Sequence, residues 1–302
     1  MTNMKIALGA VQFGLPYGVS NKLGKVGDSE VKEILQYALK KGIKTLDTAP
    51  LYGNSEEIIG NFIHDNNGKC FDIVTKTPHF KSGCIDNKQI NKFIETFNLS
   101  QKILGQESIY GLLVHNCDDL FLPGGEKLFK VMTELKESGA VKKIGVSVYD
   151  SEQIDIVLDN YPVDLVQLPV SIIDQRLVKS GHLDKLKKLG VEIHARSIFL
   201  QGLLLMPLNS IHPWFNPIKE TLKMIHKEAE KQNISVLQLA MDFVNSIDEI
   251  DKIVTGVNSL EQLSEIINIS PSFIDKNKLH NLSINDPIFL NPSNWEAGVY
   301  SK

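Results

Sequence analysis

The chain has 302 residues, of which 42% are hydrophobic and 23% are charged, and its formal net charge at pH 7 is −4. This ordinary globular composition argues against collagenous, low-complexity and disulfide-rich proteins, and the slightly acidic balance gives no basic surface for nucleic acid. Neither a leader-like start nor an uninterrupted apolar window of roughly 18 residues is visible, so we expect a soluble, cytoplasmic protein without membrane contact.

Short apolar runs alternate with longer amphipathic stretches, which is the pattern of repeated strand–helix units. The first expected strand covers residues 6–11, and a glycine-bearing loop leads from it to a helix over residues 29–41, with Asp28 as its N-cap and Gly42 just beyond its end. The other expected strands cover residues 44–47, 71–76, 109–114, 143–147, 165–168, 191–197 and 252–256. The other expected helices cover residues 55–64, 87–104, 125–138, 151–160, 183–189, 218–232, 236–246 and 260–267.

Eight strands with following helices predict an α/β protein that closes into a (β/α)8 TIM barrel. An open, doubly wound sheet shows the same alternation and is the competing architecture, but the number and spacing of the units favour the barrel. No composition shift or low-complexity linker divides the chain, so we expect one domain over residues 1–302. The stretch from about residue 274 to 302, with Pro287, Pro292 and Trp295, is expected to form an irregular C-terminal tail.

Four polar residues stand at or just after the ends of consecutive expected strands: Asp47, Tyr52, Lys76 and His115. Because the active sites of such barrels lie at the C-terminal ends of the strands, these side chains are expected to converge. Asp47 and Lys76 can neutralise each other, and an ammonium group next to the Tyr52 phenol would lower its pKa toward the range of a general acid. His115 can donate to a substrate oxygen, so a carbonyl held by Tyr52 and His115 would be polarised for attack at its carbon.

Each of the four residues also has a plainer interpretation. Asp47 is equally consistent with a loop cap, and Tyr52 alone is more typical of a half-buried aromatic side chain. Lys76 is consistent with a surface ion pair or a Schiff-base lysine, and His115 with a buried imidazole. Their joint placement at strand ends favours a catalytic site.

Residues 47–56, with the sequence D-T-A-P-L-Y-G-N-S-E, resemble the D-T-A-x-x-Y-G-x-S-E signature of the aldo-keto reductase family. The segments that end at Lys76 and His115 are similar to the strands that carry the lysine and histidine of that family. The resemblance implies a catalytic tetrad in which Tyr52 is the general acid/base, Lys76 and Asp47 form the pair that tunes it, and His115 orients the substrate.

The resemblance extends to segments that hold a nicotinamide cofactor in this family. Residues 144–147 are similar to an I-G-V-S-N segment, with Val148 in place of its asparagine. Residues 195–204 resemble a loop that covers the nicotinamide ring and the pyrophosphate, with Arg196 in place of a stacking tyrosine, and residues 255–263 resemble a segment that binds the adenosine end. The implied cofactor-binding residues are Gln12, Asp47, Ser147, Gln167, Arg196, Ser197, Gly202, Gly256, Asn258, Gln262 and Glu265.

The implied cofactor is NADP(H) or NAD(H), and the family resemblance slightly favours NADP(H). Members that prefer NADP often carry lysine or arginine where this chain has Gly256 and Gln262. The implied reaction transfers hydride between nicotinamide and the carbonyl of an aldehyde, ketone or sugar-type substrate, without a metal, and Tyr52 protonates the developing alkoxide. The opening segment 11–14 is similar to bacterial members, some of which act in sugar and surface-polysaccharide pathways.

Two other functions are compatible with the same fold. A regulatory subunit would keep the nicotinamide site with little turnover and would bind a partner protein, and a lyase or aldolase would use Lys76 as a Schiff base. For an enzyme, we expect substrate contacts in long loops beyond the strands. The expected contacts lie in residues 80–86, 121–125 and 206–217 and around Trp295, and the candidates for an aromatic wall are Phe13, Tyr17, Trp214 and Phe215.

Overall fold

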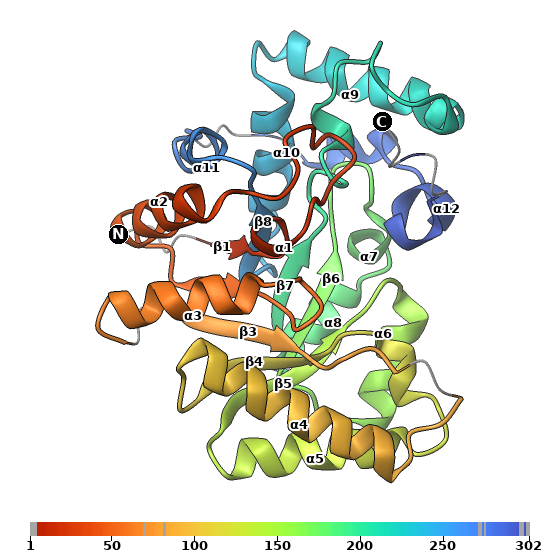
Figure 1. Ribbon diagram of the computed structural model, residues 1–302. Helices are drawn as coiled ribbons and strands as arrows, with labels where there is room; N and C mark the ends of the chain where they lie inside the picture. The colour runs from red at the N-terminus through yellow and green to blue at the C-terminus, as the bar shows by residue number, and fades with distance from the viewer. Residues whose placement is uncertain are drawn as a thin grey trace.

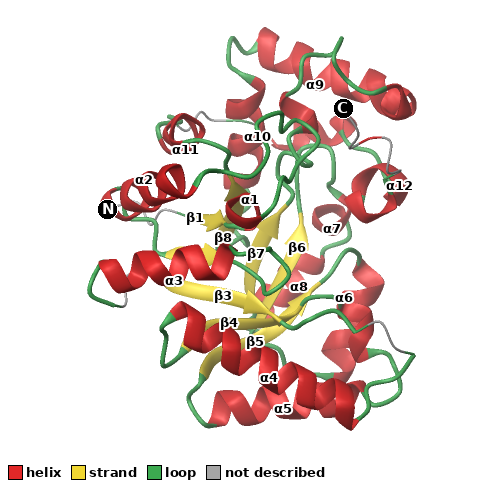
Figure 2. Ribbon diagram, viewed as in Figure 1, coloured by secondary structure: helices red, strands yellow, loops and turns green. Residues whose placement is uncertain are grey.

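The computed structural model describes residues 5–68, 71–80, 83–270, 274, 276–295 and 299. Its eight parallel strands close into a barrel in the order β1-β2-β3-β4-β5-β6-β7-β8, which confirms the (β/α)8 prediction. Figure 1 and Figure 2 show the strands at the centre of the molecule, with helices packed around them. Because the strands are parallel, the loops that follow them meet at one end of the barrel. Lys81 and Ser82, in the expected substrate loop 80–86, lie outside the described residues.

Strands and helices alternate along the chain as expected. The strands are β1 Ile6–Gly9, β2 Thr45–Asp47, β3 Asp72–Lys76, β4 Ile109–Val114, β5 Val141–Ser147, β6 Leu165–Pro169, β7 Glu192–Arg196 and β8 Lys252–Gly256. The helices are α1 Val11–Gly14, α2 Asp28–Lys40, α3 Ser55–Asp65, α4 Asn87–Leu104, α5 Gly125–Glu137, α6 Ser151–Asn160, α7 Arg176–Lys179, α8 His182–Lys188, α9 Lys219–Lys231, α10 Val236–Asn245, α11 Leu260–Ile267 and α12 Pro287–Leu290. Short 3₁₀ helices cover Cys117–Leu120, Leu203–Leu205, Pro213–Ile218, Lys276–Leu282 and Pro292–Asn294. None of the helices within the described ranges combines the length and the apolar character needed to cross a membrane.

Several element ends differ from the sequence-based expectation for local reasons. β1 ends at Gly9, two residues early, because the chain turns at once into α1. α2 begins at Asp28, so Gly27 rather than Asp28 is its N-cap, and Asp28 instead stabilises the positive end of the helix dipole from the first turn. β5 begins at Val141 because Val141 pairs with Ile109. The C-terminal tail is less irregular than the sequence predicts, since α12 and two 3₁₀ helices form there.

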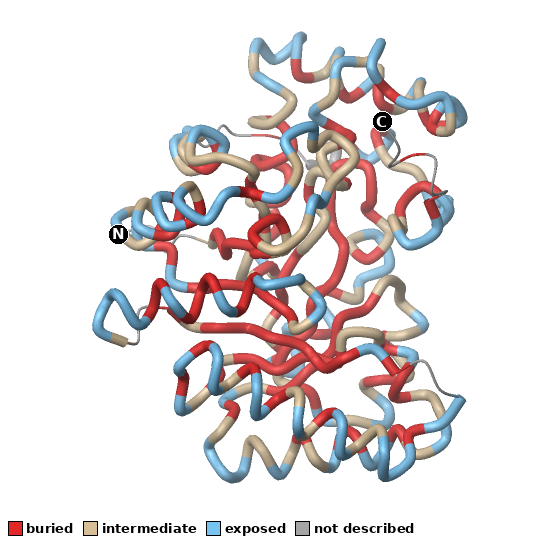
Figure 3. The backbone as a smooth tube through the Cα atoms, in the orientation of Figure 1, coloured by how far each residue is buried: buried red, intermediate tan, exposed pale blue. Residues whose placement is uncertain are grey.

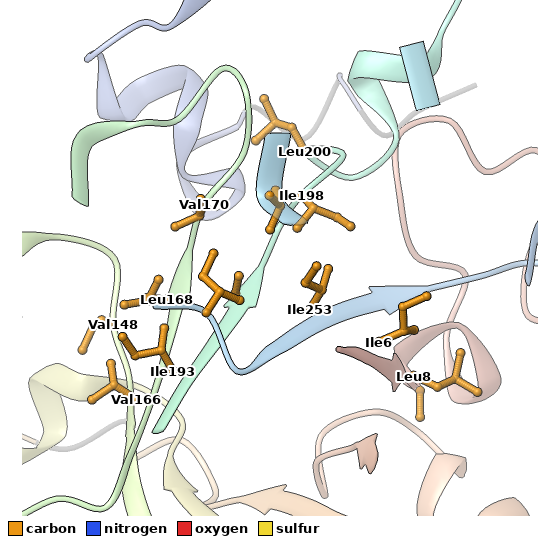
Figure 4. Packing of buried hydrophobic residues seen from close by; sticks show 14 of the residues in the cluster. Ile6, Leu8, Val148, Val166, Leu168, Val170, Ile193, Ile198, Leu200 and Ile253 are labelled. Atoms are coloured by element: carbon orange, nitrogen blue, oxygen red, sulfur yellow. The ribbon is translucent and has the colours of Figure 1, made fainter. Parts of the chain in front are cut away.

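The main hydrophobic core lies between the barrel and the surrounding helices. The strands are buried along most of their length, whereas the helices bury one face and expose the other (Figure 3). Ile6 of β1, Ile193 of β7 and Ile253 of β8 belong to this layer and lie on neighbouring strands (Figure 4). The helical period of 3.6 residues supplies the matching apolar face of each helix. This layer holds the strands in place, so the strand ends form a fixed rim.

The interior of the barrel is layered along its axis. A small apolar cluster of Val74, Leu113 and Leu165 is separate from the main core. Strand side chains alternate between two faces, so Lys76 and Gln167, each two residues beyond a member of this cluster, share its face. The apolar layer therefore underlies a polar layer at the C-terminal ends of the strands, where the candidate site begins.

A second buried polar cluster lies at the N-terminal end of the barrel. Glu192 accepts hydrogen bonds from the Tyr110 hydroxyl at 2.8 Å and from the His194 ring at 2.6 Å, and it pairs with Lys143. Burial raises the pKa of Glu192, but the hydrogen bonds with His194, Lys143 and Tyr110 outweigh this effect and lower the pKa to about 2. Because this end lies away from the loops that follow the strands, we expect the cluster to stabilise the fold.

Glu192→Gln should therefore destabilise the barrel by about 2 to 3 kcal/mol, because the Lys143 ammonium loses its counter-charge. The contribution of Glu192 should be complete above 4.5, its ordinary pKa, and should disappear as the pH falls toward 2, the pKa in the folded state. Urea unfolding of both proteins from about pH 7 to about pH 3 measures this, with Glu57→Gln on the exposed face of α3 as control. A stability difference that stays constant in acid would contradict the assignment.

Candidate active site

A buried ion pair joins the ends of β2 and β3. Lys76 Nζ lies 2.7 Å from Asp47 Oδ1 and donates a second hydrogen bond to the carbonyl oxygen of Thr48 at 2.8 Å. The other carboxylate oxygen of Asp47 accepts a hydrogen bond at 2.7 Å from Gln167 Nε2, which comes from β6. The Lys76 and Asp47 side chains are only 1% and 6% exposed, so both charges depend on these contacts rather than on water. Burial lowers the pKa of Lys76, and the Asp47 carboxylate opposes this effect.

Tyr52 lies in the loop after β2, beside this pair, with Lys76 Nζ 5.0 Å from the centre of its ring. The loop is positioned by a close approach of two glycines. A Cβ atom on Gly14 would lie 1.7 Å from the carbonyl oxygen of Tyr52, and one on Gly53, where φ is +57°, would lie 2.4 Å from the carbonyl oxygen of Gly14. Because glycine alone leaves room for this contact, the end of α1 and the loop after β2 together determine where the phenol lies.

Glu56 anchors helix α3, which follows the Tyr52 loop. Its carboxylate accepts hydrogen bonds from Thr75 Oγ1 and Ser100 Oγ, both at 2.7 Å. Burial raises the pKa of Glu56, and the two hydroxyl groups, together with the charge of Lys76, oppose this effect. These bonds connect α3 to β3 and α4, so they hold the loop that carries Tyr52 against the strand that carries Lys76.

The protonation state of Tyr52 differs from the sequence-based prediction. Burial and the negative charge of Asp47 raise the pKa of the Tyr52 phenol above its ordinary value, and Arg196 opposes this only in part. The Lys76 ammonium does not lower the pKa as predicted, because Asp47 and the Thr48 carbonyl already compensate its charge. The phenol therefore keeps its proton and is suited to donate it.

His115 follows the end of β4 and lies beside Tyr52, with the two ring centres 5.9 Å apart in an edge-to-face arrangement. Its backbone N–H donates to Thr77 Oγ1 at 3.1 Å, which fixes this strand end. Burial, together with the nearby charge of Lys76, lowers the pKa of His115 to about 2. The imidazole is therefore neutral at physiological pH and can donate one hydrogen bond to a ligand.

Two adjoining chambers lie at the C-terminal end of the barrel. The large chamber has a volume of about 410 Å³ and is lined by all four predicted catalytic residues, and the small chamber, of about 160 Å³, adjoins the start of α11. Among the predicted cofactor-binding residues, Asp47, Ser147, Gln167, Arg196 and Ser197 line the large chamber, Asn258, Gln262 and Glu265 line the small chamber, and Gln12, Gly202 and Gly256 line both. The structure thus brings every predicted site residue into one cleft.

Two of these residues already have protein partners that the sequence did not predict. Gln167, expected to contact the nicotinamide carboxamide, donates a hydrogen bond from Nε2 to Asp47 Oδ2. The Arg196 guanidinium lies 4.3 Å from the centre of the Tyr149 ring and donates to the carbonyl oxygen of Val148 at 3.0 Å. Arg196 is therefore stacked on a tyrosine from the loop after β5, which fixes the plane of its guanidinium.

Buried polar atoms without a partner are concentrated along the cleft. Within the described part of the chain, the unpaired buried atoms that belong to lining residues are Gln12 Oε1, His115 Nδ1, Gln201 Oε1, Thr255 Oγ1 and Asn258 Oδ1. Buried polar atoms are normally hydrogen-bonded, so their concentration here indicates a polar ligand. Gly256 lines both chambers, and a Cβ atom there would lie 2.2 Å from Gln12 Oε1. The lining therefore fits an elongated polar molecule such as a dinucleotide.

The described residues of the substrate loops expected from the sequence do not line the two chambers. No described residue of 80–86, 121–125 or 206–217, nor Trp295, lines either chamber. Trp214 and Phe215 pack against aromatic rings of the tail, with ring centres 4.8 and 4.9 Å apart, and this mutual burial keeps them away from the cleft. Phe13 is fully buried in the core, so Tyr17 alone among the aromatic candidates lines the chambers.

Two polar side chains of the large chamber were missed by the sequence analysis. His79 stands three residues after Lys76, and its ring centre lies 4.4 Å from that of His115. Tyr149 stands two residues after Ser147 and lines the same chamber. Their positions just beyond the ends of β3 and β5 could have identified them, because the loops of such a barrel carry functional groups there.

Comparisons with known proteins agree with this geometry. A sequence profile described as the Aldo/keto reductase family matches residues 5–282. D-arabinose 1-dehydrogenase of Saccharomyces cerevisiae is 23% identical over 256 residues, which cover 77% of this chain and 74% of that protein. L-galactose dehydrogenase of Arabidopsis thaliana is 24% identical over 284 residues, which cover 87% and 84% of the two chains. A solved aldo-keto reductase from Bacillus halodurans has the same fold, with a TM-score of 0.74 and 20% identity over 92% of this chain and 91% of that one.

Gly14→Ala should lower kcat for the carbonyl reduction expected from the sequence by about 100-fold, because the added methyl group displaces the Tyr52 loop. Gly83→Ala is the matched control, since a Cβ atom at Gly83 meets no atom within 4 Å. Steady-state kinetics measures the effect, and thermal unfolding confirms that both variants are folded. Full turnover in a folded Gly14→Ala protein would show that the glycine contact does not position the phenol.

Proposed function

Because the chain belongs to the aldo/keto reductase family, we propose that it transfers hydride between a nicotinamide cofactor and a carbonyl compound at the large chamber, with Tyr52 as the general acid/base. The family assignment makes the protein an NAD(P)H-dependent oxidoreductase. The observation that supports this role for Tyr52 is the position of its phenol beside the buried pair of Asp47 and Lys76, in a cleft lined by unpaired polar atoms.

In the direction of reduction, Tyr52 donates its proton to the carbonyl oxygen as negative charge develops there. The neutral His115 ring donates a second hydrogen bond to the same oxygen and orients the carbonyl. The Lys76 ammonium, 5.0 Å from the centre of the ring, packs against Tyr52 and holds the phenol in place, and solvent returns a proton to Tyr52 after the transfer. The bound dihydronicotinamide supplies the hydride that the carbonyl carbon accepts. One carbonyl, one reduced cofactor and one proton thus give one alcohol and one oxidised cofactor.

The cofactor would extend along both chambers. Ser147 and Gln167 lie at strand ends in the large chamber, near the tetrad, and would hold the nicotinamide end. Gly202 and Gly256 line both chambers and leave room for the middle of the molecule. The cofactor is NADP(H) or NAD(H), and the family resemblance slightly favours NADP(H).

We further propose a small hydroxylated aldehyde or ketone of the sugar type as substrate. Two relatives are named for dehydrogenation of D-arabinose and L-galactose. In the large chamber, His79, Tyr149 and Arg196 offer polar groups near the tetrad, which suit hydroxyl groups on a substrate. Cytoplasmic location and a single domain over residues 1–302 are part of this proposal and rest on the composition of the chain.

A Schiff-base role for Lys76 is less compatible with the geometry. The Lys76 amine donates to both Asp47 and the Thr48 carbonyl, and attack on a substrate carbonyl would require it to leave both partners. Burial lowers the pKa of Lys76, but the adjacent Asp47 carboxylate favours the ammonium form, which is not a nucleophile. The pair is better suited to positioning the Tyr52 phenol.

Tyr52→Phe should bind the reduced cofactor with unchanged affinity and lower kcat by about 100- to 10,000-fold, because only the proton donor is lost. Cofactor titration measures binding, and steady-state reduction of glyceraldehyde and of open-chain sugars measures turnover. Tyr161→Phe is the control, since the Tyr161 hydroxyl donates to the Leu120 carbonyl and does not line the chambers.

Unchanged turnover in Tyr52→Phe would show that another group supplies the proton. Tight cofactor binding by the wild-type protein without reduction of any carbonyl would instead indicate the regulatory subunit considered above. Trapping of a substrate on Lys76 by borohydride would indicate the lyase.

The rate of carbonyl reduction should be independent of pH from about pH 5 to about pH 9, because neither proton-dependent group of the site titrates in that range. The pKa of Tyr52 is raised, so the phenol stays protonated as the pH rises. The pKa of His115 is lowered to about 2, so the ring stays neutral as the pH falls. A pH profile of kcat at saturating substrate measures this, and a decline centred near neutrality would contradict these protonation states.

A further inference from the structure

The described lining of the large chamber carries a positive charge that nothing in that lining balances. Its charged residues are Asp47, Lys76 and Arg196. Asp47 and Lys76 neutralise each other at 2.7 Å, so the Arg196 guanidinium has no carboxylate partner among the described lining residues. Arg196 is half-buried, and water therefore screens its charge less than it screens the charge of an exposed side chain. The large chamber is accordingly suited to an anion.

The Arg196 guanidinium is held in one plane and keeps donors for a ligand. Its carbon lies 4.3 Å from the centre of the Tyr149 ring, and its N–H groups donate to the Val148 carbonyl at 3.0 Å and to Ser197 Oγ at 3.2 Å. An arginine carries five N–H donors, and the others have no hydrogen-bond partner among the described residues. A guanidinium that is already fixed loses little conformational entropy when it binds a carboxylate or a phosphate.

The charge of Arg196 acts directly on the two groups that would hold the carbonyl oxygen. Burial lowers the pKa of His115, and the charges of Lys76, His79 and Arg196 lower it further. Burial and the charge of Asp47 raise the pKa of Tyr52, and the charge of Arg196 opposes this effect. All of these side chains line the large chamber. A small molecule whose oxygen is held by Tyr52 and His115 can therefore also reach Arg196.

The proposed position of the cofactor does not account for this charge. The middle of the cofactor, which carries the pyrophosphate, would lie beside Gly202 and Gly256, where the two chambers join. Arg196 and Tyr149 line only the large chamber, together with the tetrad. The nicotinamide ring is neutral when reduced and positive when oxidised, so a neighbouring cation does not favour its binding. The unbalanced charge is therefore better matched by the substrate.

We propose that the carbonyl substrate carries an anionic group, a carboxylate or a phosphate ester, which Arg196 binds while Tyr52 and His115 hold the carbonyl oxygen. This inference rests on the proposed function, because it places the carbonyl beside the tetrad. A carboxylate or a phosphate can accept two parallel hydrogen bonds from one guanidinium, and Tyr149 holds that guanidinium in its plane. Arg196 is thus a specificity-determining residue that selects charged over neutral aldehydes and ketones.

Steady-state reduction by the wild-type protein with saturating cofactor tests the proposal on two matched pairs of aldehydes. Glyceraldehyde 3-phosphate is compared with glyceraldehyde, and succinic semialdehyde with butanal, so each pair tests one anionic group. We expect kcat/KM to be at least about tenfold higher for the charged member of one pair or of both, and the pair that shows the difference distinguishes phosphate from carboxylate. Equal values within both pairs, or higher values for both neutral members, would overturn the proposal. Absence of reduction of all four aldehydes would instead contradict the proposed function.

Arg196→Gln should reduce the ratio of kcat/KM for the charged aldehyde to that for the neutral aldehyde by about tenfold or more, mainly through a higher KM for the charged one. The neutral aldehyde is the internal reference, so a general loss of activity does not change the ratio. Lys142→Gln is the matched control, because it removes the same charge from an exposed position on β5 outside both chambers. An equal loss in Lys142→Gln would show that net charge, and not Arg196, sets the preference.

Tyr149→Leu gives a second test that keeps the arginine. The ratio should fall by a few-fold, because the guanidinium loses the ring that fixes its plane. Titration of Arg196→Gln with NADH and with NADPH measures cofactor binding separately from turnover. If Arg196→Gln weakened cofactor binding and left the ratio unchanged, Arg196 would belong to the cofactor site and the proposal would be overturned.

Discussion

The site depends on one buried ion pair, between Lys76 on β3 and Asp47 on β2. Removing two charges from water costs several kcal/mol per ion unless hydrogen bonds replace the solvent. Here both oxygens of Asp47 are bonded, one to Lys76 and one to Gln167, and Lys76 also reaches the Thr48 carbonyl. Because Gln167 lies on β6, the pair is satisfied only when the barrel has closed. The fold and the polar layer at its C-terminal end therefore stabilise each other.

Mutual neutralisation of this pair also determines the protonation of its neighbours. A lone ammonium would draw the proton from Tyr52, but the charge of Lys76 is compensated, and Asp47 raises the pKa of the phenol together with burial. The same burial keeps His115 neutral. The site thus holds two hydrogen-bond donors, a phenol and an imidazole, above a pair that carries no net charge. Such an arrangement suits an oxygen that becomes negative during reaction.

The sequence predicted the closed barrel and the set of residues in the cleft because both follow from periodicity and strand ends. Side chains at the ends of parallel strands must meet, so Asp47, Lys76 and His115 could be brought together without coordinates. The stacking of Arg196 on Tyr149 could not be predicted, because it joins the loops after β5 and β7 and depends on the paths of those loops. The packing of Trp214 and Phe215 against the tail could not be predicted for the same reason, because it joins a loop after β7 to the C-terminal segment.

The loop after β7 shows how the cleft keeps its shape. Three of the five non-glycine residues with positive φ in the described part of the chain lie there: Ser197 at 60°, Leu200 at 47° and Gln201 at 55°. Each such residue costs on the order of 1 kcal/mol, so the loop needs compensating contacts. Burial of the Leu200 side chain provides one, and turn hydrogen bonds from Leu200 to the Ser197 carbonyl and from Gly202 to the Phe199 carbonyl provide others. Because Gln201 and Gly202 line both chambers, the strained backbone of this loop fixes the junction between the large and the small chamber. The cleft therefore has its shape before any ligand enters.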